Sequence, residues 1–350
     1  MIKASNLIYN KLIQHGVKDV FLYSGGAIMP LIDTFYNQEE IKYYISSNEH
    51  NGCNAAIGYA KSSQSTGVMI TTSGPGLTNC VTSILDSQND SSPLVVISGQ
   101  VGKKSMGTQA FQECPATEIT KPITKWSYVV ENAKEIGHVI DKAFYIANDK
   151  KKGAVHIDIP KCVLTSDVEG DIDNVYDERI LNEKIFFCYD TYPRARQSRI
   201  TDRKYVLEIG NIINESKKPV FFLGKGCNEY EDIIRELVDK TGIPVATTMH
   251  AMGVFPERDE LSLGMCGMHG SYAANMALQN ADCIINIGAR FDDRTTGNVR
   301  EYGRRADNII HCNIEESEIN KNVRATHPIV GDAGEFCEKL IRCVRKTDND

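Results

Sequence analysis

Between residue 2 and about residue 160, short apolar runs alternate with segments of helical periodicity, and this alternation leaves few folds open. The runs are too short for helices and carry apolar side chains on both faces, which is typical of parallel strands buried between two layers of helices. Strands are predicted at Val20–Tyr23, Tyr43–Ile45, Val68–Thr71, Leu94–Ile97 and Val155–Ile159. Helices are predicted around Leu7 to Ile13, from Cys53 to Lys61 and from Leu77 to Leu85. The segment is therefore predicted to form a doubly wound α/β domain.

The alternation stops near residue 163 and returns near residue 203. The segment between them mixes Asp, Tyr, Arg and Ser, as a linker does. Later strands are predicted at Val220–Leu223, Pro244–Thr247, Cys283–Ile287 and Ile309–Asn313, and a last helix from Ala333 to Val344. With 350 residues, 41% of them hydrophobic, the chain can bury two cores. We predict domains at residues 1–163 and 203–347, joined by a linker at 164–202.

Composition excludes several classes of protein. The formal net charge of −7 gives no reason to expect nucleic acid or an anionic membrane as a partner. The eleven cysteines lack metal-site spacing, since the closest pair, Cys337 and Cys343, is six positions apart, and the histidines form no metal-binding pair. No signal peptide or membrane span is evident at the N-terminus. We therefore expect reduced thiols, no bound metal in this chain and a cytoplasmic location.

Glycine and proline clusters follow the predicted strands of the first domain, at the strand ends where open α/β sheets bind ligands. They are Tyr23-Ser24-Gly25-Gly26, Ser73-Gly74-Pro75-Gly76-Leu77-Thr78-Asn79 and, later, Gly107-Thr108-Gln109-Ala110-Phe111-Gln112-Glu113. Glu49 follows a predicted strand and precedes an apolar helix. By itself it is more often an exposed helix-capping residue, but the neighbouring clusters favour a buried acid. Burial lets a carboxylic acid hold a proton more readily, because desolvation disfavours the carboxylate.

The second domain carries three turn segments after apolar runs. Gly224-Lys225-Gly226 lacks the third glycine of a dinucleotide fingerprint, so it is a weak signal. The other two are longer, Gly264-Met265-Cys266-Gly267-Met268-His269-Gly270 and Gly288-Ala289-Arg290-Phe291-Asp292-Asp293-Arg294. Arginine suits phosphate binding because its planar fork donates two parallel hydrogen bonds. The alternative is a charged surface cluster.

Together these segments resemble the acetolactate (acetohydroxyacid) synthase family of thiamine diphosphate enzymes. The resemblance implies a pyrimidine-binding domain followed by a Rossmann-like central domain that binds FAD. It implies that Glu49 is the catalytic acid against a ring nitrogen of the cofactor. It further implies cofactor contacts at Tyr23, Gly25, Gly26, Pro75, Asn79 and Gln112. Ala110 and Phe111 would face the substrate channel and Lys161 would lie at its mouth, although Phe111 could equally be a core residue and Lys161 a solvated charge.

For the second domain, the resemblance implies that FAD meets a larger set of residues. Arg290 and Arg294 would contact its phosphates or ring oxygens, with Asp292 nearby, and Asn313 would stand where the family has an acidic residue that holds ribose or adenine. Lys151 stands where the family has an arginine that reaches the diphosphate. The remaining implied contacts are Gly224, Gly226, Met268, His269 and Gly288.

The implied reaction joins pyruvate to a second 2-oxo acid, giving 2-acetolactate or 2-aceto-2-hydroxybutyrate and CO2 in branched-chain amino acid biosynthesis. In the family a third domain holds the diphosphate and Mg²⁺ through a Gly-Asp-Gly motif, and here the only late Gly-Asp pair is Gly331-Asp332. We therefore expect the third domain to be absent from this chain, which would be either the N-terminal part of a longer enzyme or one product of a split gene whose partner chain supplies that domain. A homodimer or tetramer and a regulatory subunit are also implied. The alternatives are a non-catalytic flavin- or metabolite-binding relative that associates with a complete enzyme, and a two-domain nucleotide-binding oxidoreductase.

Overall fold

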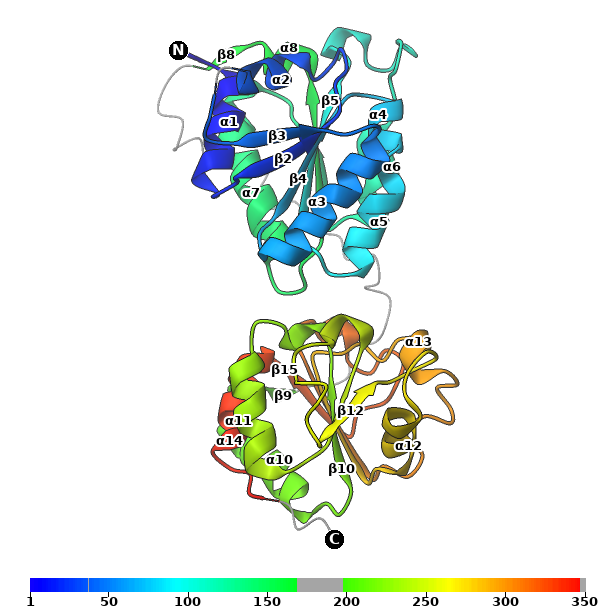
Figure 1. Cartoon of the computed structure of the whole chain (residues 1–350). Coiled ribbons are helices and arrows are strands. Elements are labelled where there is room, and N and C mark those ends of the chain that lie inside the picture. The colour runs from blue at the N-terminus through cyan, green and yellow to red at the C-terminus, as the bar shows by residue number, and fades with distance from the viewer. Residues whose placement is uncertain (37, 169–197, 347–350) are drawn as a thin grey trace. The chain divides into compact units, whose positions relative to one another are not determined.

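The computed structural model describes residues 1–36, 38–168 and 198–346, which form two compact units, Met1–Asp190 and Thr191–Asp350 (Figure 1). Each unit is a parallel sheet covered by helices, so the prediction of two doubly wound α/β domains is confirmed. Among the helices of the described ranges, none is long and apolar enough to cross a membrane.

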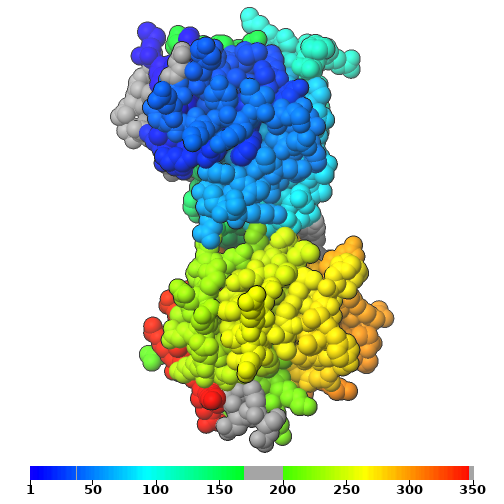
Figure 2. Space-filling view, viewed as in Figure 1, coloured from blue at the N-terminus to red at the C-terminus, as the bar shows by residue number. Residues whose placement is uncertain are grey.

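The sheet of the first unit is parallel throughout its described strands, in the order β3-β2-β4-β5-β7-β6. Its strands are β2 (Asp19–Leu22), β3 (Lys42–Ile45), β4 (Gly67–Thr71), β5 (Leu94–Gln100), β6 (Trp126–Val129) and β7 (Ala154–Pro160). The inner strands β4, β5 and β7 are buried along their whole length, as expected of strands with apolar side chains on both faces, although β5 and β7 also bury polar side chains. The edge strand β3 is exposed, and in the space-filling view the blue N-terminal residues form much of the visible surface of this unit (Figure 2).

Two layers of helices cover this sheet (Figure 1). The helices are α1 (Ala4–Gln14), α2 (Met29–Phe35), α3 (Glu49–Ser63), α4 (Pro75–Thr78), α5 (Val81–Asn89), α6 (Ala116–Thr120), α7 (Ile136–Asn148) and α8 (Lys161–Leu164). Val95 and Ile97 of β5 pack toward α1 and α7, whereas Leu94 and Val96 pack toward α3 and α5. This follows from the alternation of side chains along a strand. A short antiparallel pair joins β1 (Ile2–Lys3) to β8 (Asp167–Val168).

The second unit repeats this plan with the order β12-β11-β10-β13-β14-β15-β9, again parallel throughout. Its strands are β9 (Ser198–Arg199), β10 (Pro219–Leu223), β11 (Val245–Thr247), β12 (Ser262–Met265), β13 (Cys283–Ile287), β14 (Asn308–Asn313) and β15 (His327–Val330). One face is covered by α10 (Arg203–Glu215), α11 (Glu231–Thr241) and α14 (Ala333–Ile341). The other is covered by α12 (Tyr272–Asn280), and α13 (Asp293–Thr296) follows β13.

Each sheet has a point near its centre at which the chain reverses its direction of winding. In the first unit the chain passes from β2 outward to β3 and then crosses back to β4 on the other side of β2. In the second unit it passes from β10 through β11 to β12 and then crosses back to β13. The turns that follow β2 and β4, and those that follow β10 and β13, therefore meet at switch points. Ligands of open α/β sheets bind at such points.

Several strands and one helix break are absent from the prediction. The strands not predicted are β1, β6, β8, β9, β12 and β15, whose sequences are short, polar or interrupted by proline. The helix predicted at 77–85 is two helices, α4 and α5. Most of the predicted linker lies outside the described residues, and β8 and β9, near its two ends, pair with β1 and β15.

Candidate functional site

The turns after β2 and β4 touch at the first switch point. A Cβ added to Gly25 would lie 2.4 Å from the Cβ of Thr72, so the two turns can approach this closely only because residue 25 has no side chain. The amide of Ala27 donates to Thr72 Oγ1 at 3.4 Å and joins the turns further. Gly26 differs, since an added Cβ would meet nothing within 4 Å. The exposed backbone at Gly26 is therefore open to a ligand.

Replacing Gly25 with alanine should destabilise the first unit by about 1–3 kcal/mol, because the buried, branched Thr72 side chain cannot move aside. The neighbouring Gly26→Ala substitution adds the same methyl group where there is space, and it serves as the matched control. Chemical unfolding of both variants checks the expectation. Equal stabilities would show that the turns are not packed as described.

Glu49 is the first residue of α3 and lies at the same edge of the sheet. Its side chain is buried, with 7% exposure, so it is not the exposed capping residue of the alternative interpretation. The cap is Asn48, whose side chain accepts from the amide of Asn51 at 2.8 Å. Asn79 donates to Glu49 Oε2 at 2.9 Å. Glu49 Oε1 accepts no hydrogen bond from any residue that the structure describes, so it is available to a ligand.

The loop 107–113 is the third element of this site. Its residue Glu113 accepts from the amides of Gly107 and Ala110, and these bonds hold the pKa of the Glu113 carboxyl below its usual range. Gln112 has a positive φ of 58°, and its carbonyl would lie 2.6 Å from a Cβ on Gly74, so the loop rests on the turn after β4. Phe111 is 87% exposed and is not a core residue.

Other predicted residues of the first unit fall on both edges of the sheet. Tyr23 continues the pairing with β4, since its amide donates to the carbonyl of Ile70 at 3.0 Å. Pro75 begins α4, and Lys161 is exposed at the start of α8, directly after β7. Lys151 precedes β7 instead and therefore lies at the opposite edge from Glu49. The backbone carbonyl of Lys151 accepts a hydrogen bond from Lys125 Nζ at 2.8 Å.

The second switch point is built by the turns after β10 and β13. A Cβ on Gly224 would lie 2.3 Å from Ala289 Cα, and one on Gly226 would lie 2.8 Å from Gly288 Cα. Gly288 itself has a positive φ of 70°. These glycines therefore allow two turns to pack against each other, which is a sufficient physical reason for their presence.

The turn 264–270 lies against the segment that follows β13. The amide of Met268 donates to the carbonyl of Arg294 at 2.7 Å, and Arg294 Nη1 lies 3.7 Å from Met268 Sδ. A Cβ on Gly267 would lie 2.5 Å from the same Arg294 carbonyl. Met268 and His269 are exposed beside this contact. The structure thus brings together two motifs that are distant in the sequence.

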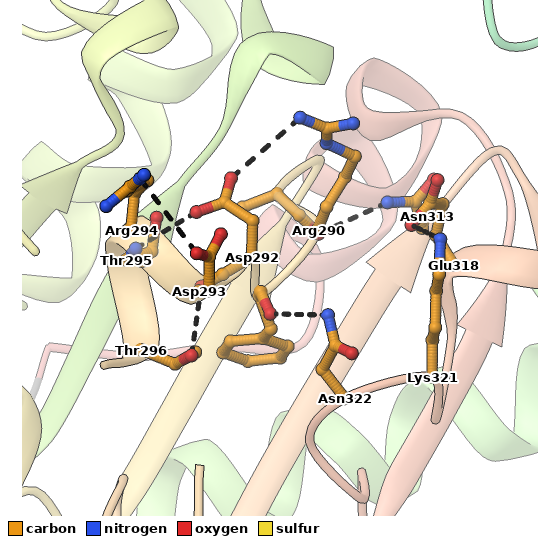
Figure 3. A network of polar contacts seen from close by, with 12 residues as sticks. Arg290, Asp292, Asp293, Arg294, Thr295, Thr296, Asn313, Glu318, Lys321 and Asn322 are labelled. Atoms are coloured by element: carbon orange, nitrogen blue, oxygen red, sulfur yellow. Dashed lines mark hydrogen bonds and ion pairs between the residues drawn. The ribbon is translucent and has the colours of Figure 1, made fainter. Parts of the chain in front are cut away.

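The charged residues after β13 are loosely paired (Figure 3). Arg290 and Asp292 approach to 3.9 Å, and Arg294 and Asp293 to 3.9 Å. Asp292 also caps α13 by accepting from the amide of Thr295 at 2.9 Å. Surface pairs at these distances contribute little to stability, so both guanidinium groups can turn to an anion at small cost.

Asn313, at the end of β14, already has internal partners. Its Nδ2 donates to the carbonyl of Ala289 at 3.2 Å (Figure 3). Its Oδ1 accepts from the amide of Glu315 at 2.9 Å. The sequence reasoning missed Glu315, whose Oε1 accepts from Ser317. Its Oε2 is buried and has no hydrogen-bond partner within the described residues. Such an oxygen needs a donor, and a ligand hydroxyl would supply one.

Comparison with known proteins identifies both units. A family model described as "Thiamine pyrophosphate enzyme, N-terminal TPP binding domain" matches residues 2–119, and one described as "Thiamine pyrophosphate enzyme, central domain" matches residues 206–340. Within the described residues no group of three or more His, Cys, Asp or Glu side chains could hold a metal ion.

Acetolactate synthases are among the curated proteins to which this chain is similar. The large subunit of Lactococcus lactis is 40% identical over 350 residues, covering 99% of this chain and 58% of the relative. The enzyme of Mycobacterium bovis is 39% identical over 98% of this chain and 54% of the relative. Acetolactate synthase 2, chloroplastic, of Nicotiana tabacum is 38% identical over 94% of this chain and 48% of the relative. The chain spans about half the length of the curated relatives it matches.

These matches confirm the family resemblance drawn from the motifs around Glu49 and Arg290. The chain belongs to the thiamine pyrophosphate enzyme family, of which it carries the N-terminal TPP binding domain and the central domain, and it is similar throughout to acetolactate synthase large subunits.

Proposed function

We propose that this chain supplies the pyrimidine-binding half of the thiamine diphosphate site of an acetolactate synthase-type carboligase. The reaction joins pyruvate to a second 2-oxo acid, releases CO2 and forms 2-acetolactate, or 2-aceto-2-hydroxybutyrate when the acceptor is 2-oxobutyrate. One observation carries the proposal: Glu49 is buried beside the first switch point, bound through Oε2 to Asn79, with Oε1 accepting no hydrogen bond from a described residue. The non-catalytic alternative is not favoured, because the relatives found are named as synthases.

The residues around Glu49 fit the pyrimidine end of the cofactor. Thiamine diphosphate, when bound, supplies the electron sink for decarboxylation and carbon–carbon bond formation. Glu49 Oε1 would share a proton with a ring nitrogen, and Asn79 would keep the carboxyl group oriented. The open backbone at Gly26 and the turn at Pro75 would border the ring, with Gln112 beside them. Burial of Glu49 excludes water from the shared proton.

The substrate would enter beside the loop 107–113. Phe111 is exposed there and offers an apolar surface to the methyl group of pyruvate. Ala110 lies beside it, and Lys161 offers a cation to the carboxylate of a 2-oxo acid from the same sheet edge. The pattern of one apolar surface and one cation suits a small oxo acid.

The second unit is proposed to bind FAD at its own switch point. Arg290 and Arg294 are held only by pairs of 3.9 Å, so they are available to phosphate oxygens. The unpartnered Glu315 Oε2 would accept from a ribose hydroxyl, while Asn313 holds the turn. Gly224, Gly226 and Gly288 pack the turns, and Asp292, Met268 and His269 border them.

The diphosphate end of thiamine diphosphate and its Mg²⁺ would be held by a third domain of the relatives' kind. Since the chain spans about half the length of those relatives, that domain is proposed to act together with it in a homodimer or tetramer. A separate chain that carries this domain and a regulatory subunit are the further proposed partners. The proposed location is the cytoplasm.

Product analysis with isotope-labelled pyruvate tests this proposal. The protein is assayed with thiamine diphosphate, Mg²⁺ and FAD, first by itself and then joined to the segment of the Lactococcus lactis relative that lies beyond the match. We expect 2-acetolactate to form in the joined protein, and only when thiamine diphosphate is present. Thiamine-dependent release of acetaldehyde without acetolactate would contradict the proposal, because it would indicate a decarboxylase instead.

A further inference from the structure

A group of polar side chains is buried between β5 and β7, apart from the residues assigned above. Ser98 and Gln100 come from β5, His156 and Asp158 from β7, and Thr120 from the end of α6. Each of them is at most 1% exposed. Buried polar groups persist only when their hydrogen bonds are satisfied, so this group has a structural or functional reason to exist.

Gln100 connects this group to the loop at the proposed substrate channel. Its Nε2 donates to Asp158 Oδ2 at 2.8 Å and to the carbonyl of Cys114 at 3.1 Å. Its Oε1 accepts from the amide of Val101 at 2.9 Å. All three bonds require one orientation of the amide. Gln100 therefore fixes the backbone at Cys114, the residue that follows the loop 107–113 with its Phe111 and Gln112.

The second carboxylate oxygen of Asp158 belongs to a chain of hydrogen bonds. Ser98 Oγ lies 2.5 Å from Asp158 Oδ1 and 2.7 Å from His156 Nε2. On the other side of the ring, His156 Nδ1 lies 2.8 Å from Thr120 Oγ1, which also contacts the carbonyl of Ala116 at 3.0 Å. Because a hydroxyl has one hydrogen, the direction of donation at Ser98 sets the tautomer of His156.

Two patterns satisfy this chain of bonds. When Asp158 is ionised, Ser98 donates to it, and His156 carries its hydrogen on Nε2 and donates to Ser98. His156 Nδ1 then accepts from a hydroxyl, either Thr120 Oγ1 at 2.8 Å or Ser127 Oγ at 3.2 Å. When Asp158 is protonated, it donates to Ser98, Ser98 donates to His156 Nε2, and the ring hydrogen on Nδ1 goes to Thr120. The bond from Gln100 to Asp158 is charge-assisted only in the ionised pattern, so it is stronger there.

Few titratable groups face Asp158. They are His156 from β7, and Cys114 with its neighbour Glu113 from the end of the loop. Strand β5 faces Asp158 with Ser98 and Gln100, which do not titrate, and β6 pairs with it through Val129. Burial raises the pKa of Asp158 to about 6 and lowers the pKa of His156 to about 3. Backbone hydrogen bonds lower the pKa of Glu113. Asp158 is thus the group of this set that changes charge in mildly acidic solution, while His156 stays neutral.

We propose that Asp158 is a positioning residue for the loop 107–113. Through Gln100, Asp158 holds the backbone that presents Phe111 and Gln112, and this backbone is held most tightly when Asp158 is ionised. The role of that loop in catalysis rests on the proposed function. The hydrogen bonds of Asp158 with Gln100 and Ser98 do not rest on it, because they join residues of this chain alone.

The test compares the full chain with Asp158→Asn by NMR and hydrogen exchange. Asparagine has the shape of the protonated acid, since its amide can donate to Ser98 while its oxygen accepts from Gln100. Nitrogen NMR of His156 in the wild type should show the Nε2–H tautomer at about pH 7.5 and the Nδ1–H tautomer at about pH 5. In Asp158→Asn the ring should remain Nδ1–H at both. An unchanged wild-type tautomer, or a variant that still switches, would overturn the proposal.

Exchange of the loop amides measures the hold on the backbone. Two amides report on this backbone: that of Ala110 in the loop, and that of Ala116 at the start of α6, which donates to the Cys114 carbonyl at 2.8 Å. After correction for intrinsic rates, their protection should fall about fivefold to tenfold in the wild type between about pH 7.5 and about pH 5. In Asp158→Asn the protection of these amides should be low and the same at both pH values. Gln100→Leu should lower protection at both pH values yet leave the His156 tautomer switch intact. Wild-type protection in both variants would overturn the proposal.

A kinetic measurement tests whether Asp158 affects the proposed reaction through the loop. In the joined, active enzyme, Asp158→Asn should raise KM for pyruvate about tenfold and remove its pH dependence, with a smaller change in kcat. An unchanged KM would overturn the link to the loop's proposed role. If no enzyme activity appears at all, the proposed function fails, while the tautomer and exchange results still decide the positioning role.

Discussion

Replacing Glu49 with glutamine should lower the rate of acetolactate formation by at least about a hundredfold, the usual size of a lost acid–base contribution. Glutamine keeps the length of the side chain, and its oxygen can still accept from Asn79, which now donates at 2.9 Å. What it loses is the ability to share a proton through the oxygen that is Oε1 in the wild type. The assay is the joined enzyme with saturating thiamine diphosphate and pyruvate.

The matched control is Glu118→Gln, an exposed glutamate in α6 of the same unit. It makes the same chemical change away from the sheet edge and should leave the rate unaltered. Chemical unfolding of Glu49→Gln should stay close to that of the wild type, because the packing around residue 49 is preserved. A folded Glu49→Gln enzyme with full activity would refute the assignment of Glu49 as the catalytic acid.

His156→Gln should make the first unit markedly more resistant to acid than the wild type. Burial lowers the pKa of His156 from its ordinary value of 6.5 to about 3. Between these values the unfolded chain binds a proton that the folded chain does not. The contribution of neutral His156 to the free energy of unfolding is fully present above pH 6.5. It is lost as the pH falls toward 3, by about 1.4 kcal/mol per pH unit and about 5 kcal/mol in total.

The measurement is the difference in unfolding free energy between His156→Gln and the wild type across this range of pH. The difference is needed because burial raises the pKa of Asp158 to about 6, so its stability contribution changes in the opposite sense between its ordinary value of 3.8 and about 6. His250→Gln, at an exposed histidine of the second unit, is the control. Parallel pH profiles for His156→Gln and the wild type would show that His156 titrates normally.

The inner strands could be predicted from the sequence because both of their faces are buried. Strands such as Leu94–Gln100 and Cys283–Ile287 therefore contain short apolar runs, Leu94–Ile97 and Cys283–Ile285. The edge strands Trp126–Val129 and Ser262–Met265 could not be predicted, because they are partly exposed and carry no such run, whereas the exposed edge strand β3 was predicted from Tyr43–Ile45. Their places are fixed by pairing with a neighbour, which no local pattern records.

The candidate site was predictable where a residue follows a strand and a glycine lies within a few positions of it. Glu49, Gly25 and Arg290 meet that condition, and each lies after the carboxyl end of a strand. Lys151 was selected by resemblance alone and lies at the other edge. Glu315 and the group around Asp158 were missed, since only the folded structure shows which buried polar atoms face one another or remain unpartnered.

The most direct measurement is a crystal structure of the joined enzyme with thiamine diphosphate bound. We expect Glu49 Oε1 to lie about 2.7–3.0 Å from a nitrogen of the pyrimidine ring, within hydrogen-bond distance. We also expect the ring to lie between Gly26 and Pro75. A bound cofactor whose ring makes no contact with Glu49 would show that Glu49 is not the acid of the thiamine diphosphate site.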